Sequence, residues 1–173
     1  KSPKNTLRAT CEEFSRIYRG HKEGVFMYGD RTSKKQDTKL EKGENFFTLS
    51  TNYLSAFNPI ERLPSRNPGV KSRGEFINQI FAGNIPGANI VIGDNCTNSI
   101  ADYLYLKEAA DGTKFKEKTT DKASKVRYEK YGHCSDANDY LYIEILKPQF
   151  DRFTNGGIIK KAIFGRRTPK KRF

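Results

Sequence analysis

The chain has 173 residues, of which 35% are hydrophobic and 12% aromatic, so we expect one domain, residues 1–173, with a sizeable core. The 32 Lys and Arg residues against 20 Asp and Glu give a formal net charge of +12, which favours acidic partners: nucleic acid, anionic lipid or an acidic protein. Three cysteines and two histidines without a Cys-x-x-Cys pair exclude a disulfide framework and argue against structural zinc. No apolar run has the roughly 18 residues of a membrane helix, so we expect a soluble chain with no membrane span.

The N-terminal third begins with a predicted helix. A capping-box pattern at residues 10–13 and apolar residues at helical spacing indicate a helix that ends near Tyr18. The run 25–28 is typical of a strand between two glycines. The lysine-rich range 31–44 indicates a solvated loop or a weak surface helix.

The stretch FFTLSTNYLSAF, residues 46–57, is the most suggestive part of the chain. Its bulky apolar residues predict a short strand at 46–49. Ser50, Thr51 and Asn52 then place hydroxyl and amide groups at the end of that strand, where a ligand could bind. The alternative interpretation is that these three residues form an ordinary helix cap.

The middle of the chain alternates apolar and polar segments. Apolar spacing predicts a helix over 74–81, a short buried strand at 89–92 and a further helix over 99–110. Residues 111–130 are the most polar and least periodic part, and we interpret them as a mobile insertion.

The last third contains a regular alternation. Residues 140–146, YLYIEIL, place Leu141, Ile143 and Ile145 on one face and predict a central strand. A closing strand is expected at 158–164, before a basic tail at 166–173. The predicted fold class is α+β: helices early, then a small, mainly antiparallel sheet.

Three patches in this order resemble a known family. They are IYRG at residues 17–20, LSTN at 49–52, and YLYIEI followed by GGIIKKAIFGRR. Together they are similar to motifs of the mono-ADP-ribosyltransferase toxins of the cholera, heat-labile enterotoxin and pertussis type. The resemblance implies a single catalytic domain in which a split sheet surrounds an NAD cleft.

The resemblance also implies an activity. Such enzymes cleave the bond between nicotinamide and ribose of NAD, the cosubstrate, and transfer ADP-ribose to a macromolecular acceptor, here expected to be a host protein. By this resemblance Arg19 would hold the NAD phosphates, and Ser50, Thr51 and Asn52 would lie beneath the nicotinamide half of the site. An arginine suits the first role because its planar fork grips anionic oxygens bidentately. No metal is required.

The family's catalytic glutamate lies in a Glu-x-Glu or Gln-x-Glu pair just before the GGI-like segment. The corresponding residues here are Gln149 and Asp151, and Asp151 is one methylene shorter than glutamate. Glu144, within the predicted strand, is the reserve candidate for the carboxylate. Arg31 is the second choice for the phosphate anchor, after Arg19.

Two function classes follow. The first is an NAD-dependent ADP-ribosyltransferase toxin or effector, secreted or delivered into a target cell, with room for a delivery subunit. The alternative is a basic protein directed at nucleic acid, either an RNA binder or a ribonuclease using His133 with Arg or Lys. A transferase-like fold that has lost activity is a third reading, because the usual glutamate is absent.

Overall fold

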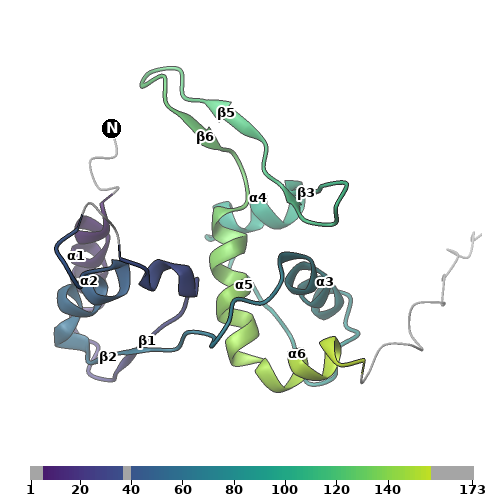
Figure 1. Cartoon of the computed structure of the whole chain (residues 1–173), viewed down its shortest axis with the longest axis horizontal. Helices are drawn as coiled ribbons and strands as arrows, with labels where there is room; N and C mark the ends of the chain where they lie inside the picture. The colour runs from purple at the N-terminus through teal and green to yellow at the C-terminus, as the bar shows by residue number, and fades with distance from the viewer. Residues whose placement is uncertain (1–5, 37–39, 157–173) are drawn as a thin grey trace, which may run out of the picture. The chain divides into compact units, whose positions relative to one another are not determined.

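A computed structural model describes residues 6–36 and 40–156. The chain divides into two compact units, one ending at Pro68 and one beginning at Gly69, and each is described by itself. Within the described residues there are six α-helices, two short 3-10 helices and three two-stranded sheets (Figure 1). The α+β class is thereby confirmed at this coarse level. No described helix has the length and apolar character needed to cross a lipid bilayer.

The N-terminal unit combines helices with one parallel strand pair. Its elements are α1 (Leu7–Ile17), β1 (Val25–Met27), the 3-10 helix η1 (Arg31–Lys34), α2 (Phe46–Tyr53), the 3-10 helix η2 (Ser55–Phe57) and β2 (Pro59–Glu61). β1 pairs with β2 in parallel, which confirms the strand expected at 25–28. Cys11, Leu54 and Phe57 form the buried core of this unit.

The strand expected at 46–49 is wrong, because these residues begin helix α2. The Asn45 side chain accepts hydrogen bonds from the backbone N–H groups of Phe47 (3.0 Å) and Thr48 (3.1 Å). In return, Thr48 Oγ1 accepts one from the Asn45 N–H at 2.8 Å. This reciprocal capping box satisfies donors that the first helical turn leaves unpaired. Ser50, Thr51 and Asn52 therefore lie within a helix and not at the end of a strand.

The C-terminal unit contains most of the regular structure. Its elements are α3 (Val70–Phe81), α4 (Thr97–Tyr105), β3 (Lys107–Glu108), β4 (Lys114–Phe115), β5 (Lys118–Thr120), β6 (Arg127–Glu129), α5 (His133–Ile145) and α6 (Lys147–Thr154). β3 with β4 and β5 with β6 form antiparallel hairpins. The core packs α3 against α5 and α6 and includes Phe76, Ile77, Ile80, Ile143 and Phe150.

The predicted central strand at 140–146 is also wrong, because residues 140–145 belong to helix α5. The buried residues of this helix are Ser135, Asp139, Tyr140 and Ile143, a spacing of three and four that matches one helical face. Gly132 precedes the helix with a φ of 111°, a conformation that favours glycine. Burial along one helical face thus outweighs the local alternation.

Other predicted elements have mixed outcomes. α3 and α4 confirm the two helices of the middle segment, although α3 begins at Val70 and α4 ends at Tyr105. The strand expected at 89–92 is wrong, since this range has no regular structure and Val91 is 83% exposed. The polar range 111–130 contains β4, β5 and β6. The closing strand at 158–164 and the basic tail lie outside the described residues.

Candidate functional site

The four predicted NAD-binding residues all lie in the N-terminal unit. Arg19 is exposed in the turn after α1. The Ser50 hydroxyl donates a hydrogen bond to the Phe46 carbonyl at 2.7 Å, one helical turn back. The Thr51 hydroxyl oxygen is buried and has no hydrogen-bond partner among the described residues, whereas Asn52 is exposed. The Ser50 hydroxyl can therefore only accept a hydrogen bond from a ligand, and the Thr51 hydroxyl oxygen is buried.

The three predicted catalytic residues lie in the C-terminal unit. Glu144 is half-buried near the end of α5, and Gln149 and Asp151 lie on α6. The Asp151 side chain is half exposed and lies 3.5 Å from Lys147 Nζ. The predicted NAD-binding residues and the predicted catalytic residues therefore belong to different units.

His133, the residue of the ribonuclease hypothesis, is the first residue of α5. Its side chain is 68% exposed, and Nε2 lies 3.8 Å from Glu129 Oε2. A histidine in this position is open to solvent and lines neither of the two cavities described next.

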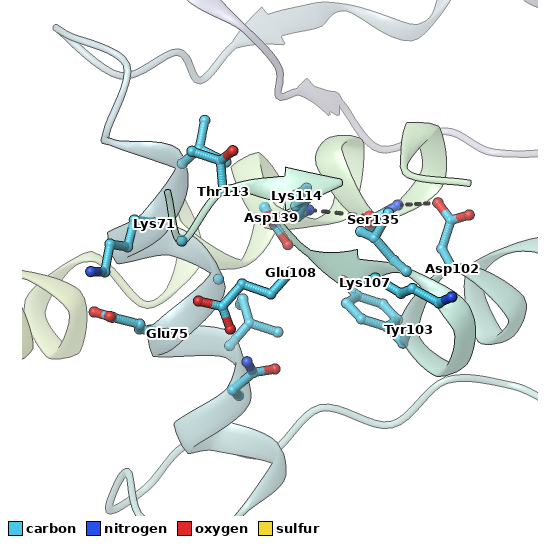
Figure 2. Close-up of a pocket in the computed structure, with 16 residues that line it drawn as sticks. Lys71, Glu75, Asp102, Tyr103, Lys107, Glu108, Thr113, Lys114, Ser135 and Asp139 are labelled. Atoms are coloured by element: carbon cyan, nitrogen blue, oxygen red, sulfur yellow. Dashed lines mark hydrogen bonds and ion pairs between the residues drawn. The ribbon is translucent and has the colours of Figure 1, made fainter. Parts of the chain in front are cut away.

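A cavity of about 140 Å³ lies within the C-terminal unit, between α3, α4, the β3–β4 hairpin and α5. Figure 2 shows Lys71 and Glu75 extending from α3 on one side of it, with Tyr103 and Lys107 on the other. Its inner wall contains buried polar groups from α4 and α5. The cavity is therefore lined by both signs of charge.

Lys114 on β4 is the centre of that inner wall. Its Nζ lies 2.6 Å from Asp139 Oδ2 and 3.0 Å from Asp136 Oδ1, and donates to Ser135 Oγ at 3.1 Å. An ammonium group has three protons to donate and no acceptor. Ser135, Asp136 and Asp139 together match the three donors of the Lys114 ammonium group.

The pKa values of the two aspartates shift in opposite directions. Burial raises the pKa of Asp139, whose side chain is 1% exposed, and the positive charges of Lys114 and Arg73 oppose that rise without cancelling it. Burial would also raise the pKa of Asp136, but hydrogen bonds and charges from Lys116 and Lys114 outweigh it, so this pKa is lowered. Asp136 is thus the better charge partner of the two.

Asp102 completes the polar wall from α4. Its carboxylate is 5% exposed and accepts a hydrogen bond from the Ser135 backbone N–H at 2.9 Å, in the first turn of α5. A carboxylate at a helix N-terminus accepts a hydrogen bond from a backbone N–H that has no partner within the helix, and its negative charge interacts favourably with the helix dipole. The main result of this network is to join α4, α5 and the β3–β4 hairpin, a structural task.

A second cavity, of about 490 Å³, lies in the N-terminal unit and is strongly basic. We call it the cationic groove. Its lining residues are Arg31, Thr32, Lys34, Lys35, Ser65, Arg66 and Asn67. Four of the seven carry positive charge, and none carries a carboxylate.

A polar contact between Asp30 and Asn67 connects the two segments that line the cationic groove. Asp30 Oδ1 accepts hydrogen bonds from the Thr32 N–H at 2.6 Å and from Asn67 Nδ2 at 2.5 Å. Asn67 Oδ1 in turn accepts one from the Arg31 N–H at 2.9 Å. These bonds join η1 to the loop after β2 across 36 and 37 residues of sequence, so both walls of the groove are fixed to each other.

The charges in the groove are only partly compensated. Lys34 lies 2.5 Å from Glu61, and Arg31 donates to the Pro64 carbonyl at 3.3 Å. Lys35 and Arg66 are exposed and form no ion pair with another residue in the part of the chain that the structure describes. Hydroxyl, amide and unpaired cationic groups together are typical of phosphate-binding surfaces.

The sequence contains only a partial signal for this groove. The range 31–44 is visibly lysine-rich, and the resemblance makes Arg31 the second choice for a phosphate anchor. The contribution of residues 65–67 depends on the Asp30–Asn67 contact, which has no local signature in the sequence.

Comparison with known proteins yields no relative. No family model, no curated protein and no solved structure matches the chain. Within residues 6–36 and 40–156, no group of three or more His, Cys, Asp or Glu side chains could hold a metal ion.

Proposed function

We propose that this protein binds nucleic acid, and that the cationic groove contacts the phosphate backbone. The observation that carries the proposal is the lining of the groove, with four basic residues and no acidic one. Phosphate contacts supply most of the sequence-independent affinity of nucleic-acid-binding proteins. The net charge of +12 adds a long-range attraction for a polyanion.

The groove contains the donor types that phosphates use. Arg31 and Arg66 have planar guanidinium groups that can bind phosphate oxygens bidentately. Lys35 adds an exposed point charge, and Ser65 adds a hydroxyl. The Asp30–Asn67 contact fixes the backbone that bears these groups, which reduces the entropy lost on binding.

The test is a binding titration with labelled DNA and RNA oligonucleotides. Lys35→Gln/Arg66→Gln removes the two unpaired cations of the groove, and we expect an affinity loss of about tenfold at about 50 mM salt. The matched control is Lys22→Gln/Lys42→Gln, which removes the same charge at exposed sites outside the groove. Equal losses in the two variants would show attraction to the net charge alone and contradict a groove site.

ADP-ribosyl transfer is the second candidate, supported by the ordered sequence patches and by the exposure of Arg19. An exposed arginine with no ion pair among the described residues is available to bind the NAD diphosphate. In this reading the chain is an NAD-dependent toxin or effector with an ADP-ribosyltransferase-like fold, acting on a macromolecular acceptor. The helical setting of Ser50 and Thr51 does not add to this support.

An assay of nicotinamide release from NAD tests this second candidate. Arg19→Lys should weaken NAD binding by about 1–3 kcal/mol, and Asp151→Ala should lower turnover about 100-fold. Glu144→Gln is the control, with little effect expected. If the parent protein releases no nicotinamide, the transferase reading is excluded.

A further inference from the structure

The β5–β6 hairpin extends away from the helices of the C-terminal unit (Figure 1). Its ladder pairs Lys118 with Glu129, Thr119 with Tyr128 and Thr120 with Arg127. Apart from Thr119 and Glu129, the residues of this ladder are exposed. A two-stranded ribbon with so little buried surface is only marginally stable by itself. Core packing therefore does not account for the composition of its exposed faces.

A well-defined turn forms the tip of the hairpin. Asp121 Oδ1 accepts hydrogen bonds from the backbone N–H groups of Ala123 at 3.1 Å and Ser124 at 2.6 Å. Lys125 follows with a φ of 59°, and Lys122 and Lys125 are both exposed. The Asp121 carboxylate is engaged in shaping the turn, so the tip presents two lysines.

The hairpin carries a surplus of positive charge. Residues 118–129 contain four basic residues and two acidic residues, Asp121 and Glu129. Lys118 and Arg127 lie on the same face, since residues two apart in a strand and cross-strand partners share a face. On the opposite face Tyr128 is 49% exposed and Val126 is 60% exposed. None of the four cations forms an ion pair with another described residue.

The base of the hairpin is anchored to α5. Lys116 Nζ lies 2.5 Å from Asp136 Oδ2 and 3.2 Å from Glu129 Oε2. Lys114, just before it, holds the buried Asp139. These ion pairs of Lys114 and Lys116 connect the base of the hairpin to α5. They fix the direction in which the β5–β6 hairpin extends from α5.

We propose that the β5–β6 hairpin enters a groove of duplex nucleic acid, an inference that rests on the proposed nucleic-acid binding. The major groove of B-DNA, about 12 Å wide, admits a two-stranded β-ribbon. The face that carries Lys118 and Arg127 then lies toward the groove, where these two residues and the tip lysines contact phosphate oxygens. Charge complementarity and shape together identify duplex nucleic acid as the partner.

The experiment compares a labelled duplex of about 20 base pairs with its single strand. Lys118→Gln/Arg127→Gln should weaken duplex binding about tenfold and single-strand binding less than about threefold. A second variant, Lys122→Gln/Lys125→Gly, removes both lysines of the tip and should likewise weaken duplex binding more than single-strand binding. Glycine replaces Lys125 because it tolerates the positive φ of that position. Lys22→Gln/Lys42→Gln is the charge-matched control, and circular dichroism verifies that each variant is folded.

The outcomes separate the two proposals. If the parent protein binds neither oligonucleotide, the proposed function fails and the hairpin inference fails with it. If the parent binds duplex and both hairpin variants bind it equally well, only the hairpin inference is overturned. Equal losses on duplex and single strand would also overturn it.

Discussion

Lys114 is the residue on which the polar wall of the C-terminal unit depends. Its Nζ is the nearest cation to Asp139, whose side chain is 1% exposed. Lys114→Met should lower the free energy of unfolding by about 3–5 kcal/mol at pH 7, because it leaves a buried carboxylate without its partner. Urea denaturation measures this loss. Lys118→Met is the control, and a change beyond about 0.5 kcal/mol is not expected at that exposed position; similar losses for the two variants would contradict the account.

Asp136 should make stability depend on pH. Its pKa is lowered in the folded protein, so its ion pairs contribute fully above the ordinary carboxyl pKa of about 4 and are lost as the pH falls through the lower folded value. Asp136→Asn should therefore lower the free energy of unfolding near pH 7 by about 1–3 kcal/mol. The difference between parent and variant should shrink toward about pH 3. A difference that stays constant over this range would show that Asp136 is not the titrating group.

At the scale of an element, the stabilisation of helix α2 by its capping box can be tested by substitution. Asn45→Ala removes the side chain that caps Phe47 and Thr48, and should cost about 1 kcal/mol of unfolding free energy. Asn52→Ala changes an exposed amide on the same helix and should be neutral or slightly stabilising, since alanine favours helix. Thermal or urea unfolding distinguishes the two. If both variants match the parent, the capping box does not stabilise the helix.

The elements that the sequence predicts well are those whose apolar spacing agrees with their burial. In α3, Phe76, Ile77 and Ile80 are all buried and lie one, three and four residues apart, so periodicity is a sufficient guide. In α5 only Ile143 of the alternating Leu141, Ile143 and Ile145 is buried. The buried face of α5 also contains Asp139, whose partner Lys114 lies 25 residues away in the sequence. This contact, more than the alternation, determines which face of α5 is buried. No local pattern contains that contact.

The cationic groove, like α5, depends on a contact between residues that are distant in the sequence. The excess of Lys and Arg is visible in the sequence and favours an anionic partner, but it does not show where the cations gather. The cationic groove requires Asp30 to bind Asn67 across 37 residues, a long-range contact that composition cannot reveal. Ser50, Thr51, Asn52 and Glu144, which were chosen by resemblance, lie in helices where the sequence predicts a strand or the end of one.

At the scale of the whole molecule, basic surfaces occur in both units. The N-terminal unit has the cationic groove, and the C-terminal unit has the β5–β6 hairpin with its four cations. Each unit by itself therefore presents cations that a polyanion can contact. Much of the net charge of +12 comes from residues 157–173, which contain seven basic residues and no acidic residue and lie outside the described residues.

The most direct test of nucleic-acid binding is the salt dependence of the parent protein's association constant for a labelled duplex, measured between about 50 and 300 mM NaCl. Each phosphate neutralised contributes a slope of about −0.9 in log K against log salt, so the four cations of the groove predict a slope of about −3.6 or steeper. Lys35→Gln/Arg66→Gln should reduce its magnitude by about 1.8. No binding at low salt, or a slope near zero, would contradict the proposed function.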